Sequence, residues 1–118
     1  MIHANAKQFI LEYLKNNLKN IGLATGEKPL LDTATQLTDE VIRKEITSPL
    51  IDGNILVSEI YLDETEGNDL LFKSMGLING EFADVIGEGE LFISGQMNEQ
   101  KDNTQSLTIS IELELVEI

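Results

Sequence analysis

The apolar side chains of the first segment recur at spacings of three and four residues. This pattern predicts an amphipathic helix over about residues 5–20, packed on a sheet. The predicted buried stripe consists of Ala6, Phe9, Ile10, Tyr13, Leu14 and Leu18, followed by Ile21. Asn5 is a suitable N-cap, and Gln8 three positions later completes a capping box. Gly22 marks the expected end, because glycine readily takes the left-handed conformation that stops many helices.

After this helix the apolar period changes to two, which predicts β-strands. The alternation is clearest over residues 104–117, where one face is apolar and the other polar. The apolar positions there are Leu107, Ile109, Ile111, Leu113 and Leu115. Such alternation is typical of an antiparallel sheet with one buried and one solvated face. Further strands are predicted at about 40–47, 54–63, 70–78 and 90–97.

Segments 54–63 and 70–78 are apolar on both faces, so both are expected in central positions. We expect them to pair as a hairpin, because the polar residues 64–68 between them suit a turn. Ser48-Pro49 is expected to end the preceding strand, and Asp52-Gly53 to form a turn. The sequence thus predicts an α+β fold in one domain, 1–118, with the helix packed on a mainly antiparallel β-sheet or small β-sandwich.

The charge of the chain is strongly asymmetric. Its 118 residues carry a net charge of −13, and residues 45–118 alone carry about −14 against about +1 for residues 1–44. A field this negative repels nucleic acid and anionic membranes. The sequence has no cysteine and no run near the roughly 20 apolar residues of a membrane span. We therefore expect a protein made in the cytoplasm that binds neither nucleic acid nor membranes.

The candidate chemical sites each have a simpler interpretation. His3 lies in a terminus that is expected to fray, which argues against catalysis. Residues 63–69 offer oxygen ligands for calcium but lack the EF-hand spacing, so a solvated turn is expected. Glu112 and Glu114 are expected to keep an exposed strand face soluble rather than to act as acid and base. No enzyme, metal or cofactor is predicted.

Residues 86–90 contain Gly87 and Gly89 near a predicted strand, as in a phosphate-binding loop. The neighbouring glutamates would repel a phosphate, and no helix is predicted to follow. We expect an ordinary turn.

Three short stretches carry a resemblance. They are IGLATG at 21–26, QLTDEVIR at 36–43 and Met75-Gly76-Leu77. Their order resembles the small prophage tail and baseplate proteins related to the N-terminal domain of phage tail-collar fibre proteins. In that family a strand of the type a-h-G-x-G is followed by an x-L-x-x-E-h-x-R block and a later E-h-G-L strand. The resemblance covers most of residues 5–115.

The sequence departs from the family at two places. Ser74 stands where the family usually places a glutamate before h-Gly-Leu, and we expect no fibre shaft or tip after the last predicted strand. The resemblance therefore implies an adaptor or attachment module rather than a fibre.

Within the matched block, Leu37 and Val41 are expected to anchor the segment in the core, with Ile42 as a further candidate. Glu40 and Arg43 are expected to form a charged pair that braces the turn at Gly26. The alternatives are an exposed pair contributing well under about 1 kcal/mol, or contact with a neighbouring subunit. The brace or interface candidates are Leu37, Glu40, Arg43, Gly26 and Gly76.

The resemblance implies a non-enzymatic structural component of a phage or prophage tail or baseplate, located in the virion tail after assembly in the host cytoplasm. Its partners would be other tail or baseplate proteins and further copies of itself, in a ring or trimer. The acidic portion favours one alternative, an inhibitor that imitates nucleic acid and blocks a DNA-binding protein of the host. A small hydrolase would instead need a pocket with convergent polar groups.

Overall fold

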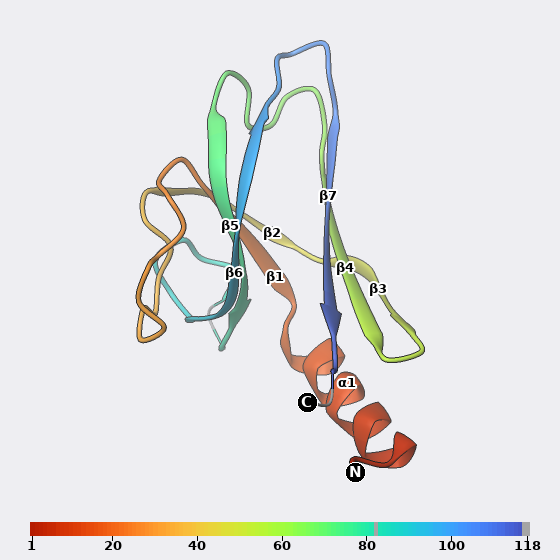
Figure 1. Cartoon of the computed structure of the whole chain (residues 1–118). Helices are drawn as coiled ribbons and strands as arrows, with labels where there is room; N and C mark the ends of the chain where they lie inside the picture. Colours follow the sequence, from red (N-terminus) through yellow and green to blue (C-terminus); the bar gives the residue numbers. More distant parts are fainter. Residues whose placement is uncertain (82, 117–118) are drawn as a thin grey trace.

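The computed structural model describes residues 1–81 and 83–116, and within them the chain forms one helix and seven strands (Figure 1). The elements are α1 (Ala4–Asn17), β1 (Asn20–Ala24), β2 (Glu40–Glu45), β3 (Thr47–Asp52), β4 (Ile55–Leu62), β5 (Leu71–Asn79), β6 (Glu90–Gln100) and β7 (Leu107–Glu114). The strands form a four-stranded sheet of order β2-β1-β5-β6 and a three-stranded sheet of order β3-β4-β7. All pairings between these strands are antiparallel. This is a small α+β fold built mostly of strands.

The main core lies between the two sheets, because strands of both contribute to one cluster of buried side chains. Ile21, Leu23 and Leu77 come from the four-stranded sheet, and Ile60 and Ile109 from the three-stranded sheet. The cluster is aliphatic apart from a buried phenylalanine from β5. Burial of these side chains supplies most of the driving force for bringing the sheets together.

The chain passes between the sheets three times, at Ile46, at residues 63–70 and at residues 101–106. The predicted hairpin of segments 54–63 and 70–78 is therefore wrong, since β4 and β5 belong to different sheets. Residues 63–70 instead contact the last crossover, where the Asp69 N–H donates to the Lys101 carbonyl at 2.8 Å. Both segments do take central positions, each in its own sheet.

Strands β2, β4, β5, β6 and β7 overlap the five predicted strands, but β1 and β3 were missed. All five residues of β1 are buried, so β1 shows no alternation of polar and apolar positions. Pro49 was expected to end a strand but lies within β3, at the edge of its sheet. An edge strand tolerates proline, and the β3–β4 pairing is irregular between Thr47 and Leu50. The predicted alternation in β7 is confirmed.

Helix α1 ends earlier than predicted. Its N-cap is His3, without a side-chain cap, and the His3 carbonyl accepts the N–H groups of Ala6 and Lys7. The predicted capping box at Asn5 is therefore wrong, because Asn5 lies inside the helix. Gly22 does not end the helix either but lies in β1.

The predicted buried stripe of α1 is also largely wrong. Leu11 and Leu18 are buried, and Leu14 packs against the core cluster. Phe9 and Tyr13 instead are 72% and 58% exposed. The helix carries apolar side chains on two faces, and the period of the pattern alone does not identify the one that packs.

Candidate functional site

A β-bulge places Glu40 and Arg43 on the same face of the four-stranded sheet. Glu40 pairs with Ala24 and Arg43 with Gly22, with a register shift between them. Residues three apart in a regular strand point to opposite faces, so the extra residue of the bulge is what brings the two side chains together. This outer face is turned away from the main core, since Ile21 and Leu23 on either side of Gly22 point inward.

Glu40 and Arg43 form a two-pronged ion pair on this face. Arg43 Nε donates to Glu40 Oε2 at 2.5 Å, and Arg43 Nη2 donates to Glu40 Oε1 at 2.6 Å. The side chains of Arg43 and Glu40 are 1% and 4% exposed. The residues as a whole are only partly buried, because β2 is an edge strand and its backbone meets solvent. The alternative of an exposed pair is therefore wrong.

The remaining Arg43 donors hold the segment between β5 and β6. Arg43 Nη1 donates to the carbonyls of Ala83 and Glu88 at 2.6 and 3.0 Å. The pair was expected to brace the turn at Gly26, but its hydrogen bonds go to residues 83–88 instead. The predicted turn at 86–90 is confirmed, with Gly87 and Gly89 at positive φ. Arginine thus connects an edge strand to a loop 40 residues further along the chain.

Gly22 and Gly76 lie opposite each other on β1 and β5 beneath this cover. A Cβ atom at Gly22 would meet the Glu40 carboxylate and lie 3.2 Å from Leu37 Cδ1. One at Gly76 would lie 3.0 Å from the Ile93 carbonyl oxygen and 3.5 Å from Leu37 Cδ2. The two glycines therefore leave space for Leu37, for the ion pair and for Leu91, whose Cδ1 a Cβ at Gly76 would meet first. We name this surface, Gly22, Gly76, Leu37, Glu40 and Arg43, the glycine face.

The turn at Gly26 adjoins the glycine face through Ser74. Ser74 is fully buried, and its Oγ donates to the Gly26 carbonyl at 2.8 Å. A Cβ at Gly26 would lie 2.9 Å from the Thr38 carbonyl carbon, so the chain packs tightly there. The Ser74 hydroxyl therefore stabilises this turn. In the family that the sequence resembles, this position usually holds a glutamate.

Further hydrogen bonds join the loop of residues 25–39 to the strand and loop beside it. Leu91 N–H donates to the Thr35 carbonyl at 2.9 Å, and Gln36 Nε2 donates to the Gly89 carbonyl at 3.0 Å. Sequence reasoning missed these contacts and the roles of Gly22 and Ser74. The IGLATG stretch did contain Gly22, but nothing in the sequence showed which glycine would lie under a side chain.

The structure thus brings four predicted candidates together on the glycine face and places Gly26 on the adjoining turn. Its charged groups are buried and fully engaged with each other and with backbone carbonyls. Such an arrangement fixes the position of loops and leaves no acid, base or nucleophile open to a solute.

The acidic turns at the two later crossovers are organised by their own hydrogen bonds. In the first, Thr65 donates to Asp63 from both its hydroxyl and its N–H, which lowers the pKa of Asp63. In the second, Thr104 lowers the pKa of Asp102 in the same way. Within residues 1–81 and 83–116, no group of three His, Asp or Glu side chains is placed to hold a metal ion.

Glu66 connects the first of these turns to the four-stranded sheet. Lys44 Nζ donates to its two carboxylate oxygens at 2.9 and 2.8 Å. This hydrogen bond and a weaker one from the Asp63 N–H lower the pKa of Glu66. The pair is about a third exposed, unlike the Glu40–Arg43 pair.

The outer face of the three-stranded sheet has a different character. Glu112 and Glu114 are exposed there, and Glu112 lies opposite Val57 and Glu114 opposite Ile55. The same face carries exposed Leu50, Tyr61 and Glu59. The sequences of β3, β4 and β7 contain no lysine or arginine. We name the surface of Asp52, Glu59, Glu112 and Glu114 the acidic face.

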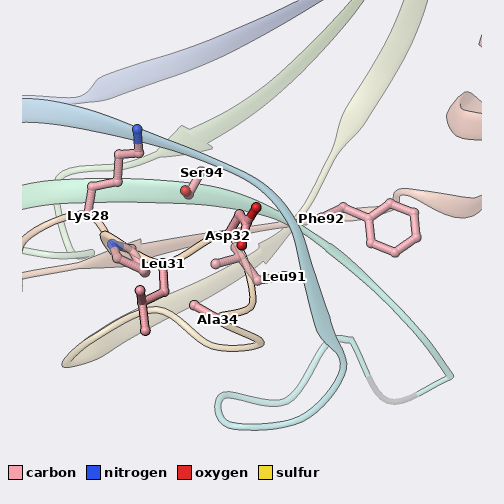
Figure 2. A pocket seen from close by; sticks show the side chains of 8 residues that line it. Lys28, Leu31, Asp32, Ala34, Leu91, Phe92 and Ser94 are labelled. Atoms are coloured by element: carbon pink, nitrogen blue, oxygen red, sulfur yellow. The ribbon is translucent and has the colours of Figure 1, made fainter.

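A depression of about 290 Å³ lies between the loop of residues 25–39 and β6 (Figure 2). Its lining includes Lys28, Asp32, Leu31 and Ser94. Figure 2 shows Phe92 pointing away from Leu31 and Asp32. The charged groups beside it are one lysine and one carboxylate, and His3 lies in another part of the chain, at the start of α1.

Comparisons with known proteins add no relative to this picture. No protein-family model matches the chain, and no curated protein matches it. In the part of the chain that the structure describes, no helix has the length and apolar character that crossing a membrane requires.

Proposed function

We propose that this protein is a non-enzymatic structural component of a phage or prophage tail or baseplate, acting as an adaptor through protein contacts. The resemblance on which the assignment rests involves Leu37, Glu40, Arg43 and Gly76, which meet on the glycine face. Their engagement with one another suits a structural role better than a chemical one.

The observation that carries the proposal is the second apolar face of α1. Phe9 and Tyr13 are four residues apart and largely exposed, and Ala6 precedes them by three and seven. Spacings of three and four place these side chains in one stripe, as in the seam between associating helices. A helix with two apolar faces needs two partners, and this chain supplies one of them.

We propose that the first partner is the three-stranded sheet. Leu11 and Leu18 are buried, and α1 has neighbours in β3 and β4. Figure 1 shows α1 at the end of the molecule where β7 ends. Docked in this way, α1 presents Phe9 and Tyr13 to further copies of the chain, which assemble as a ring or trimer.

The mass in solution, measured by light scattering over a range of concentrations, tests the assembly. We expect a multiple of the 13.1 kDa chain mass. Replacing Phe9 and Tyr13 together by serine should return the protein to the monomer mass. Leu50→Ser, which also removes an exposed apolar side chain, is the matched control and should leave the assembly intact. A monomer at every concentration would contradict the proposal.

The tail assignment has a separate test in the genes that flank this one. A position within a cluster of tail or baseplate genes supports it, together with recovery of the protein in purified virion tails. A position outside any such cluster removes its main support.

The exposed carboxylates of the acidic face favour a second candidate function, an inhibitor that imitates nucleic acid. Glu112 and Glu114 are two residues apart on one strand and point to the same side. Such an inhibitor should lose its basic partner steeply as salt concentration rises, whereas an apolar interface through α1 should not.

A further inference from the structure

We propose that the free edge of β7 binds an extended segment of another protein as a fourth strand of the three-stranded sheet. The segment has apolar side chains on the core side of the sheet. Its lysine or arginine side chains lie on the other side, beside the carboxylates of the acidic face. The inference does not depend on the tail assignment, because it concerns a different surface from the stripe on α1.

The edge of β7 is regular enough to act as a template. All eight residues of β7 pair with β4 without a register shift, and the strand contains no proline, glycine or lysine. Among the described residues, β7 has β4 as its strand neighbour in the sheet and no strand on its other side. An edge of this kind readily accepts another strand.

The other strand edges are less suitable. The β3 edge is interrupted by Pro49 and a register shift. The pairing of β2 has a bulge, and that of β6 with β5 has two register shifts. Irregular pairing twists an edge and hinders addition of a strand. The β7 edge therefore stands out from the edges of both sheets.

The core side of β7 is incompletely covered. Ile109 is buried, but Leu107, Ile111 and Leu113 in the same row are only partly buried. Leu107 and Ile111 pack against the main core cluster. Apolar side chains of an added strand would lie beside this row and extend the layer between the sheets.

The solvent side of β7 determines the charge of the partner. Glu112 and Glu114 are exposed, and no lysine or arginine lies on the strands of this sheet to neutralise them. A neighbouring strand with lysine or arginine at alternate positions would place opposite charges beside them, which stabilises strand pairing.

A second copy of the chain does not offer such a strand. The basic residues in its strands are Arg43, Lys44 and Lys73, each of which already lies near a carboxylate. The occupant is therefore a different protein with a basic amphipathic segment.

A synthetic peptide of eight alternating valine and lysine residues, with both ends blocked, is the probe. Added to the full-length protein, it should bind by titration calorimetry and slow amide hydrogen exchange along β7. The same peptide with a methyl group on every backbone nitrogen has the same charge but has no N–H group to donate to the carbonyls of β7, so it should not bind. Equal binding of both peptides, or slowed exchange elsewhere but not in β7, would overturn the proposal.

Charge reversal on β7 supplies the second test. The double variant Glu112→Lys and Glu114→Lys should bind the valine–lysine peptide at least about tenfold more weakly and should gain affinity for a valine–glutamate peptide. Glu81→Lys with Glu90→Lys makes the same change in net charge at exposed positions in the other sheet and its loop, and should change neither preference. If both double variants lose the peptide equally, or if β7 protection rises with protein concentration alone, the basic partner is excluded.

Discussion

The outer faces of the two sheets differ in how much of the chain covers them. The four-stranded sheet has glycines at its centre, and a leucine, an ion pair and two loops lie over them. The three-stranded sheet leaves its outer face to solvent, with Leu50 58% and Tyr61 48% exposed. The outer face of the four-stranded sheet therefore contributes to the stability of the fold. The outer face of the three-stranded sheet remains available for contacts with other molecules.

The charged side chains of the two outer faces also differ in their exposure to water. Glu40 and Arg43 are withdrawn from water and need each other, whereas Glu112 and Glu114 keep their hydration. Removing one member of a buried pair exposes the full cost of burying the other. Removing an exposed carboxylate costs the fold little. Substitutions on the two faces should therefore differ in their effect on stability and on binding.

The largest expected effect is that of Arg43→Met. It leaves the buried Glu40 carboxylate and the Ala83 and Glu88 carbonyls without their donor. The free energy of unfolding should fall by about 3–5 kcal/mol. Chemical denaturation with urea measures the change.

Lys73→Met is the matched control for Arg43→Met, since Lys73 lies 3.8 Å from Glu27 and is 43% exposed. It should change stability by less than about 0.5 kcal/mol. Replacing Glu40 by leucine together with Arg43→Met should cost less than Arg43→Met alone, because no unpaired charge is left buried. Equal losses for Arg43→Met and Lys73→Met would show that burial of the Glu40–Arg43 pair does not increase its contribution to stability.

A smaller loss is expected for Gly76→Ala on the glycine face. The added methyl group would lie 3.0 Å from the Ile93 carbonyl oxygen, which the strand pairing holds in place. We expect a loss of about 1–3 kcal/mol from this overpacking. Gly95→Ala in β6 is the control, because its added methyl would meet Met75 Cε at an ordinary 3.4 Å. A control variant as unstable as Gly76→Ala would show that the loss comes from replacing any glycine in these strands and not from the close contacts at Gly76.

The Glu66–Lys44 pair should make stability depend on pH. The pKa of Glu66 is lower in the folded protein than its ordinary value of 4.5, mainly because of the hydrogen bond from Lys44. Its contribution is therefore complete above about pH 5 and is lost as the pH falls through the folded pKa. Since the pair is about a third exposed, the contribution should stay below about 1 kcal/mol.

The difference in unfolding free energy between the unmodified chain and Glu66→Gln isolates this pair. It should be measured from about pH 6 to about pH 3, a range that spans the ordinary pKa of a carboxyl group. The difference should shrink as the pH falls. A difference that grows toward low pH would contradict the assigned direction of the shift.

The smallest effect is expected on the open face. Leu50→Ser removes an exposed side chain and should change stability by no more than about 0.5 kcal/mol. Thermal unfolding followed by circular dichroism is sufficient to measure it. A loss of more than about 1 kcal/mol would mean that Leu50 contributes to the fold and that this face is less open than its exposure indicates.

The strands with alternating side chains were predictable because one face of each meets the core. β7 shows this most clearly, with Ile109 buried between exposed Thr108 and Ser110. β1 was missed because both its faces are covered, so its residues show no alternation. The hairpin error has a related cause, since β4 and β5 are both central and the sequence does not show that their centres belong to different sheets.

The candidate site was partly predictable. The pairing of Glu40 with Arg43 followed from opposite charge and close spacing, but the partners of Arg43 in residues 83–88 depend on how a distant loop folds back. The sequence does not show which backbone carbonyls accept these hydrogen bonds, because every residue has one. The choice between the two apolar faces of α1 likewise depends on where Leu18 enters the core.

The bulge in β2 has a consequence for how this segment tolerates changes in length. Val41 and Ile42 are adjacent, yet both pack against the core cluster, while Glu40 and Arg43 on either side share the opposite face. Deleting one of the two apolar residues would leave a regular strand in which the acid and the base, now two positions apart, still point the same way. Deleting Arg43 would instead remove the guanidinium and move Lys44, which pairs with the inward-pointing Ile21, to the outer face. Loss of one residue from this strand should therefore be tolerated best at Val41 or Ile42, between the carboxylate and the guanidinium.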